Sequence, residues 1–164
     1  RKSMEAYAGS SVDGFKYAYL YPGINKVFQS AGRVIRTEAD GSISFGNHRL
    51  ETKQKVEDFE HDGDQYKVKT FKTMTKLERN GLFVYESVPG TSVLNFRETE
   101  KGVSFLVEGD EDAQITVGLM EDTEYVVYVD DQSIGGMKTN LGGKLNLSVE
   151  LAGAGEVKVD IVAR

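Results

Sequence analysis

The chain has 164 residues, of which 39% are apolar and 28% are charged, and it contains neither cysteine nor tryptophan. This length suits one domain with a proper core, and the composition excludes collagen, coiled-coil and disulfide-stapled scaffolds. The lack of cysteine also excludes thiol chemistry and zinc sites built on thiolates. Apolar runs such as 125–129 are too short for a membrane helix, so we expect no membrane span, and the N-terminal residues show no secretion-signal pattern.

The charge of the chain is spread unevenly along its length. Its net charge is −6, but residues 1–55 contain nine Lys/Arg against five Asp/Glu, whereas residues 56–164 contain eleven against twenty-one. An acidic bulk repels phosphate backbones, so we do not expect the C-terminal part to bind nucleic acid. The asymmetry indicates either a solubilising surface or two segments of different origin that meet near residues 40–50.

The first elements expected in chain order are a short strand over residues 17–21 and a helix over residues 22–37. Spacings of three and four between apolar residues predict one buried helical face. This face consists of Ile24, Val27, Phe28, Ala31, Val34 and Ile35. Pro22 suits the first turn of a helix, and Asp40-Gly41 supplies a stop signal. We therefore expect a helical segment over residues 1–41 that packs against the rest of the chain or a partner.

From residue 42 onward the apolar residues recur at every second position, which is typical of half-buried strands. The expected strands lie around residues 66–70, 82–85, 103–107, 115–117, 125–129, 145–151 and 157–161. Turn residues separate them at intervals of roughly ten residues, as in antiparallel sandwiches. The sequence therefore predicts a mainly β protein, with an Ig-like antiparallel β-sandwich over residues 42–164 and a self-contained unit over residues 56–164.

Residues 15–38 contain Gln29, Gly32, Arg33 and Arg36 in the pattern Q-x-x-G-R-x-x-R. This stretch resembles the last motif of superfamily 2 DNA helicases of the damage-inducible DinG kind. The resemblance implies ATP, Mg²⁺ and DNA as ancestral ligands, with Gln29, Arg33 and Arg36 facing the ATP phosphates. Arginines can stabilise charge that develops on a transferring phosphoryl group. The alternative is an ordinary amphipathic helix with solvated arginines.

Other parts of a helicase motor are missing from these residues. The sequence has no Gly-x-x-x-x-Gly-Lys-Ser/Thr phosphate loop and no Asp-Glu-Ala-His box. The family's next strand ends in Asp-x-Arg, and residues 42–49 follow that pattern poorly. We therefore expect no ATPase activity from this chain alone. The segment is interpreted as an inherited fragment, a gene fusion (a chimera) or an engineered join.

Residues 123–131 and 139–149 resemble the last strands of Ig-like or fibronectin-like accessory domains from bacterial polysaccharide-active enzymes. This resemblance implies a non-catalytic module, structural or weakly carbohydrate-binding, whose partner is a polysaccharide or a parent enzyme domain. Tyr85, Tyr125 and Tyr128 are the candidate glycan contacts, although aromatic residues on alternating strands also belong to cores. An extracellular location follows for the β domain, and a cytoplasmic one if the helicase interpretation holds.

Little else in the sequence points to chemistry. We expect His48 and His61 to lie in surface loops without a catalytic or ligand role. Acidic pairs at 62/64, 110–112 and 130/131 suit turns. Two further interpretations of these acidic pairs are that two carboxylates catalyse glycoside hydrolysis, or that the loops bind Ca²⁺. Our main expectation is no catalytic residue, no metal and no cofactor, with Ca²⁺ as the alternative.

Overall fold

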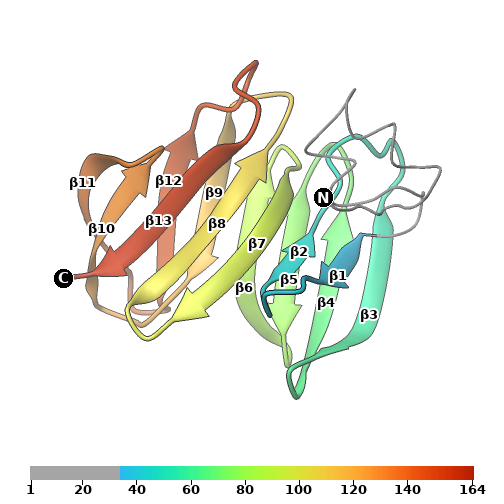
Figure 1. The fold of residues 1–164 in the computed structure, drawn as a ribbon, viewed down its shortest axis with the longest axis horizontal. Helices are drawn as coiled ribbons and strands as arrows, with labels where there is room; N and C mark the ends of the chain where they lie inside the picture. Colours follow the sequence, from blue (N-terminus) through green and yellow to red (C-terminus); the bar gives the residue numbers. More distant parts are fainter. Residues whose placement is uncertain (1–33) are drawn as a thin grey trace.

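The computed structural model describes residues 34–164, which form thirteen strands in two antiparallel sheets (Figure 1). The seven-stranded sheet has the spatial order β1 (Ile35–Thr37), β2 (Ile43–Phe45), β7 (Ser92–Thr99), β8 (Gly102–Glu108), β13 (Val157–Ala163), β10 (Glu124–Val129) and β11 (Gln132–Lys138). The six-stranded sheet has the order β12 (Lys144–Val149), β9 (Ala113–Gly118), β6 (Leu82–Val88), β5 (Thr75–Arg79), β4 (Asp64–Thr70) and β3 (Gln54–His61). The expected antiparallel, mainly β architecture is confirmed, and two sheets fit a sandwich.

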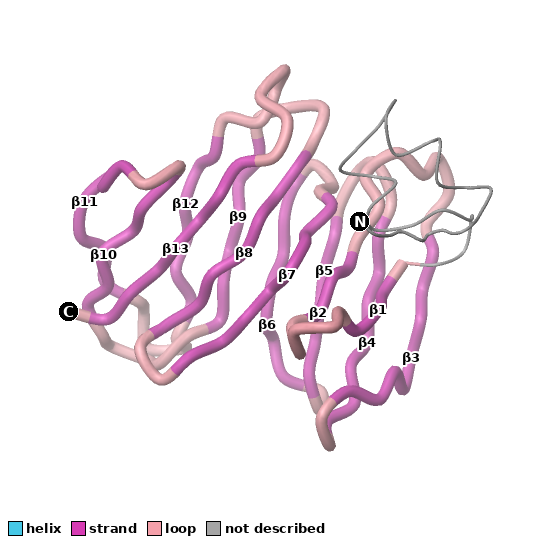
Figure 2. Tube along the Cα trace, viewed as in Figure 1, coloured by secondary structure: helices cyan, strands magenta, loops and turns pink. Residues whose placement is uncertain are grey.

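The two sheets form two layers that share one core (Figure 2). Alternation along the strands places one side of each sheet inside; in β12, for example, every second residue is buried. At the centre of the core, the ring of Phe45 meets the ring of Tyr85 at 5.3 Å and that of Phe96 at 5.6 Å, edge to face in both cases. These three rings join β2, β6 and β7, so the core links both layers.

Most of the helix expected over residues 22–37, and the strand expected over 17–21, lie outside the described residues. The last residues of that helix are described, and there the prediction is wrong, because Ile35–Thr37 form β1. Ile35 pairs with Phe45 and Thr37 with Ile43 in an antiparallel hairpin. β-Branched side chains favour strands, and the Asp40-Gly41 signal marks the hairpin turn rather than a helix end.

The β1–β2 hairpin is an integral part of the seven-stranded sheet. β2 pairs with β7, and Phe45 at the end of β2 is fully buried. A fragment that starts at residue 56 would lack both strands and this ring, so the expected self-contained unit must be extended to include them. The expected boundary between residues 41 and 42 falls inside the hairpin. Among residues 34–164 there is no helix able to span a membrane.

Candidate functional site

Arg36 is the one residue of the helicase-like pattern whose surroundings are described, since Gln29 and Arg33 lie outside the described residues. It stands on β1, and its Nε donates a hydrogen bond to Oε2 of Glu38 at 2.9 Å. The same carboxylate oxygen accepts a hydrogen bond from the hydroxyl of Ser44 on β2. Arg36 therefore projects from a strand, and its charge is already compensated by a carboxylate two residues away.

A polar hollow of about 490 Å³ lies beside this hairpin. It is lined by Gly41, Ile43, His61, Asp62, Asp64, Tyr66, Arg79, Phe96, Arg97 and Glu98. Both arginines in its wall are paired: Arg97 contacts Asp40 at 2.6 Å, and Arg79 contacts Glu98. The positive charges of this wall therefore already have carboxylate partners.

The electrostatics of this hollow follow from those pairs. Hydrogen bonds from Ser42, together with the nearby Arg97, hold the pKa of Asp40 below its usual value. Burial raises the pKa of Tyr66, whereas its hydrogen bond with Arg79 opposes that rise. Burial lowers the pKa of Arg79, but the hydrogen bonds of Arg79 with Tyr66 and Glu98 outweigh this effect, so its pKa is raised. At neutral pH the wall thus presents two paired arginines and a neutral phenol, together with the carboxylates of Asp62 and Asp64.

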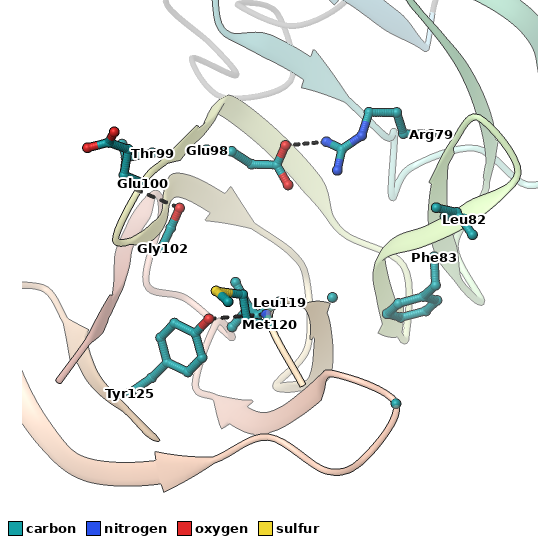
Figure 3. A pocket seen from close by; sticks show the side chains of 12 residues that line it. Arg79, Leu82, Phe83, Glu98, Thr99, Glu100, Gly102, Leu119, Met120 and Tyr125 are labelled. Atoms are coloured by element: carbon teal, nitrogen blue, oxygen red, sulfur yellow. Dashed lines mark hydrogen bonds and ion pairs between the residues drawn. The ribbon is translucent and has the colours of Figure 1, made fainter. Parts of the chain in front are cut away.

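A second hollow of about 630 Å³ adjoins the first and shares Arg79 and Glu98 with it. Figure 3 shows that pair on one side of the hollow and the rings of Phe83 and Tyr125 on the others. Leu82 and Met120 also line it and are 72% and 68% exposed. This second hollow is thus more apolar at its rim than the first.

The three tyrosines expected to contact glycans lie in different surroundings. Tyr85 is fully buried and its hydroxyl bonds with that of Thr91, so it cannot offer a ring face to a sugar. Tyr125 is also buried, and its hydroxyl accepts a hydrogen bond from the backbone N–H of Met120 at the second hollow. Tyr128, three residues further along β10, is half-buried on the opposite face of the strand. The structure does not assemble the three into one surface.

His48 is buried, so the expectation of a surface loop is wrong for this residue. Its Nδ1 lies 2.8 Å from Oγ of Ser92, and its Nε2 lies 3.6 Å from Oδ1 of Asp110. Burial lowers the pKa of His48, and the attraction of Asp110 opposes this. These are the residue types of a hydrolase triad, but Ser92 is only 1% exposed, so its hydroxyl is closed to substrates. His61 sits at the end of β3, where its Nδ1 lies 2.8 Å from Oγ1 of Thr37.

The acidic pairs mostly organise turns. The carboxylate of Asp112 accepts hydrogen bonds from the backbone of Leu151 and Ala152. Asp131 pairs with Lys158 at 3.1 Å. Within residues 34–164 no three His, Asp or Glu side chains gather in a way that could hold a metal ion. These carboxylates therefore have structural partners of their own.

Comparison with known proteins bears on the N-terminal part. A family model described as "Helicase C-terminal domain" matches residues 1–62. This part of the chain is similar to a helicase C-terminal domain. The helicase-like segment, as we call residues 1–62, includes the pattern around Arg36 and also β1, β2 and β3. The search of curated proteins and the search of solved structures gave no match.

Proposed function

We propose that this chain is a fragment or fusion of the C-terminal domain of an ATP-dependent DNA helicase and is not active as an ATPase by itself. The observation that carries this proposal is the match to the helicase C-terminal family over residues 1–62. The DinG-type pattern Q-x-x-G-R-x-x-R lies inside that match. In a complete motor, Gln29, Arg33 and Arg36 would contact the nucleotide phosphates.

The surroundings of Arg36 support an inactive state in this chain. Glu38 would compete with a phosphate for Arg36, because its carboxylate already accepts hydrogen bonds from Nε of Arg36 and from the hydroxyl of Ser44. Phosphoryl transfer also needs a phosphate cradle and Mg²⁺ ligands, which the 164 residues do not supply in any known motif. The helicase-like segment then contributes strands to the sandwich rather than a nucleotide site.

Thermal unfolding with and without Mg-ATP tests this proposal, because a ligand that binds the folded state raises its stability by mass action. We expect no shift and no phosphate release. Arg36→Ala is the test variant. Arg97→Ala is the matched control, because it removes another arginine of the same sheet, on β7, that is also paired with a carboxylate, that of Asp40. A shift that disappears in Arg36→Ala and persists in Arg97→Ala would overturn the proposal.

The adjoining hollows favour a second candidate, a weakly carbohydrate-binding accessory module. One hollow is lined with paired polar side chains, the other carries the ring of Phe83, and both share Arg79 and Glu98. Sugars present hydroxyl groups and apolar ring faces, which such a combination of polar and aromatic groups suits.

Affinity electrophoresis in gels that contain neutral polysaccharides tests the second candidate. We expect retardation that Phe83→Ala reduces and Phe71→Ala leaves unchanged, since Phe71 does not line either hollow. Migration of the chain at the same rate in gels with and without polysaccharide would exclude carbohydrate binding at the hollows. The proposal of a helicase fragment or fusion would not be affected.

A further inference from the structure

The two sheets formed by residues 34–164 have β1, β3, β11 and β12 at their edges. Three of these edge strands are short or irregular. β1 has only three residues. In β3, Asp58 has a positive φ of 59° within a register shift, and in β11, Gly135 has a φ of 110° beside another. Short strands and bulges of this kind keep a sheet edge from pairing with another chain.

The fourth edge strand, β12, is regular and lies at the end of the six-stranded sheet (Figure 1). It pairs with β9 over six successive residues without a register shift, and it contains neither glycine nor proline. Its single charged residue, Lys144, stands at the start of the strand and not at its centre. The strand itself therefore carries none of the features that protect the other three edges.

Hydrogen bonds at the start of β12 show which of its backbone groups point outward. The carbonyl oxygen of Gly143 accepts a hydrogen bond from the first residue after β9. Lys144 points the other way, because its N–H and its carbonyl oxygen both bond with Asn140 in the preceding loop. Since this direction alternates along a strand, the N–H and C=O groups of Asn146 and Ser148 point away from β9.

These outward groups are ready to accept another strand. Among residues 34–164, no hydrogen bond reaches the outward N–H and C=O groups of Asn146 and Ser148. Their side chains bond sideways to β9 and do not cover the edge. Oδ1 of Asn146 accepts a hydrogen bond from Thr116 at 2.6 Å, and Oγ of Ser148 donates one to Gln114 at 2.9 Å. Two donors and two acceptors thus stand in line along the edge, as strand addition requires.

We propose that β12 pairs with β12 of a second copy of this chain, in an antiparallel arrangement centred on Leu147. The contact uses the same surface on both copies, so it closes as a two-fold dimer in which the two six-stranded sheets join edge to edge. The sequence of residues 144–150 is complementary to itself in this register. Across the contact Lys144 faces Glu150, Leu145 faces Val149, and Asn146 faces Ser148.

The backbone and the charges agree on this register. In antiparallel strands, opposite residues bond when both direct their N–H and C=O groups at the partner. Centring on Leu147 places Asn146 opposite Ser148 twice, so every outward group of the two residues is bonded. Centring on Asn146 or on Ser148 also brings outward groups together, but Lys144 then no longer faces Glu150. A second copy therefore supplies matching charges in one register, and this contact lies outside the helicase-like segment and goes beyond the proposed function.

Sedimentation velocity of the full chain over a range of concentrations tests the proposal. We expect the weight-average mass to rise from one chain towards two as the concentration approaches about 0.5 mM, because so small an interface is of the weak class. Lys144→Glu and Glu150→Lys should each weaken the dimer about tenfold, since each places like charges opposite each other twice. The double variant should recover the original affinity. The two residues lie about 20 Å apart along one strand, so they cannot compensate each other within one chain.

Two controls accompany these variants. Lys101→Glu changes the net charge as Lys144→Glu does but lies in the β7–β8 turn, so it should dimerise like the unmodified chain. Nζ of Lys144 also lies 4.5 Å from the centre of the Phe83 ring. Glu150→Lys leaves that contact in place and thus measures the charge effect by itself. Circular dichroism of every variant checks that it folds.

Several outcomes would overturn the proposal. One is a mass of one chain at every concentration, and another is a double variant that dimerises as weakly as the single ones. An equal loss in Lys101→Glu would show that net charge is responsible. Amide exchange at Asn146 and Ser148 should slow as the dimer forms. Slowing in β11 alone would assign the contact to the other edge, and slow exchange in the monomer would mean that another part of the same chain covers β12. None of these results depends on whether the chain binds Mg-ATP.

Discussion

Nδ1 of His48 lies 2.8 Å from the hydroxyl of Ser92, and both side chains are buried. The backbone N–H of His48 also donates to the same hydroxyl at 3.2 Å. Through this contact the loop that follows β2, inside the helicase-like segment, is attached to the first residue of β7. The helicase-like segment is thus joined to the rest of the domain by polar contacts in the interior as well as by strand pairing.

The buried imidazole makes stability depend on pH. Burial lowers the pKa of His48, opposed by Asp110 and reinforced by Arg49, so the unfolded chain binds a proton more readily than the folded one. The neutral imidazole therefore stabilises the fold above the unfolded-state pKa of about 6.5, and this contribution falls as the pH drops through the lower folded-state value. Urea unfolding at pH 7.5 and 5.0 should show a smaller loss of stability in His48→Gln than in the unmodified chain. Equal losses would contradict this.

The buried hydroxyl of Thr91 serves two partners. It lies 2.8 Å from the hydroxyl of Tyr85 and 2.7 Å from that of Ser87. Thr91→Val keeps the shape but removes a partner from buried polar groups, which costs about 1–3 kcal/mol. Thr116→Val, the same change on the outer face, should stay within about 0.5 kcal/mol. Urea unfolding measures both, and equal effects would show that the interior hydroxyls do not depend on Thr91.

Gly46 and Gly63 allow backbone strain to be separated from steric conflict. Both have positive φ, +89° and +83°, but a Cβ on Gly46 would lie 2.5 Å from the carbonyl oxygen of Thr91, whereas one on Gly63 meets nothing within 4 Å. Gly46→Ala should therefore destabilise the chain by about 1–3 kcal/mol more than Gly63→Ala. A difference near zero in the free energies of unfolding would mean that the loop after β2 relaxes freely.

Removal of the charge of Lys69, on the outer face of the six-stranded sheet, should stabilise the chain. Lys69 lies opposite both Lys55 and Lys76, and each like-charge pair costs about 0.2–1 kcal/mol. We expect Lys69→Gln to raise the free energy of unfolding by that order, most clearly at low salt, whereas Lys101→Gln should change it little. A loss of stability in Lys69→Gln would show that the lysine makes a favourable contact there.

The sequence predicted the strands whose apolar residues alternate, such as β8, β12 and β13, because one face of each is buried. It missed β2, β3, β5, β7 and β11. In β11 almost all residues are exposed and two are glycines, so no face carries an apolar signal. It also misassigned Ile35–Thr37, since a short apolar run fits the period of a helix as well as that of a strand.

The candidate sites were harder to predict because they depend on long-range pairing. The partner of His48, Ser92, is 44 residues away in the sequence, and nothing near either residue indicates the contact. Lys55, Lys69 and Lys76 are visible in the sequence, but their alignment across β3, β4 and β5 depends on strand register, including a register shift between Val56 and Phe59 in β3. The helicase-like pattern, by contrast, is local and could be recognised without any knowledge of the fold.

Hydrogen–deuterium exchange of the full chain, with and without Mg-ATP, tests most directly whether the helicase-like segment acts as part of the sandwich. The account predicts that β2, which is paired on both sides and ends in the buried Phe45, is about as strongly protected as its neighbour β7, and that Mg-ATP leaves the exchange of β1 and β2 unchanged. Rapid exchange of β2 beside a protected β7, or new protection around Arg36 on addition of Mg-ATP, would contradict it.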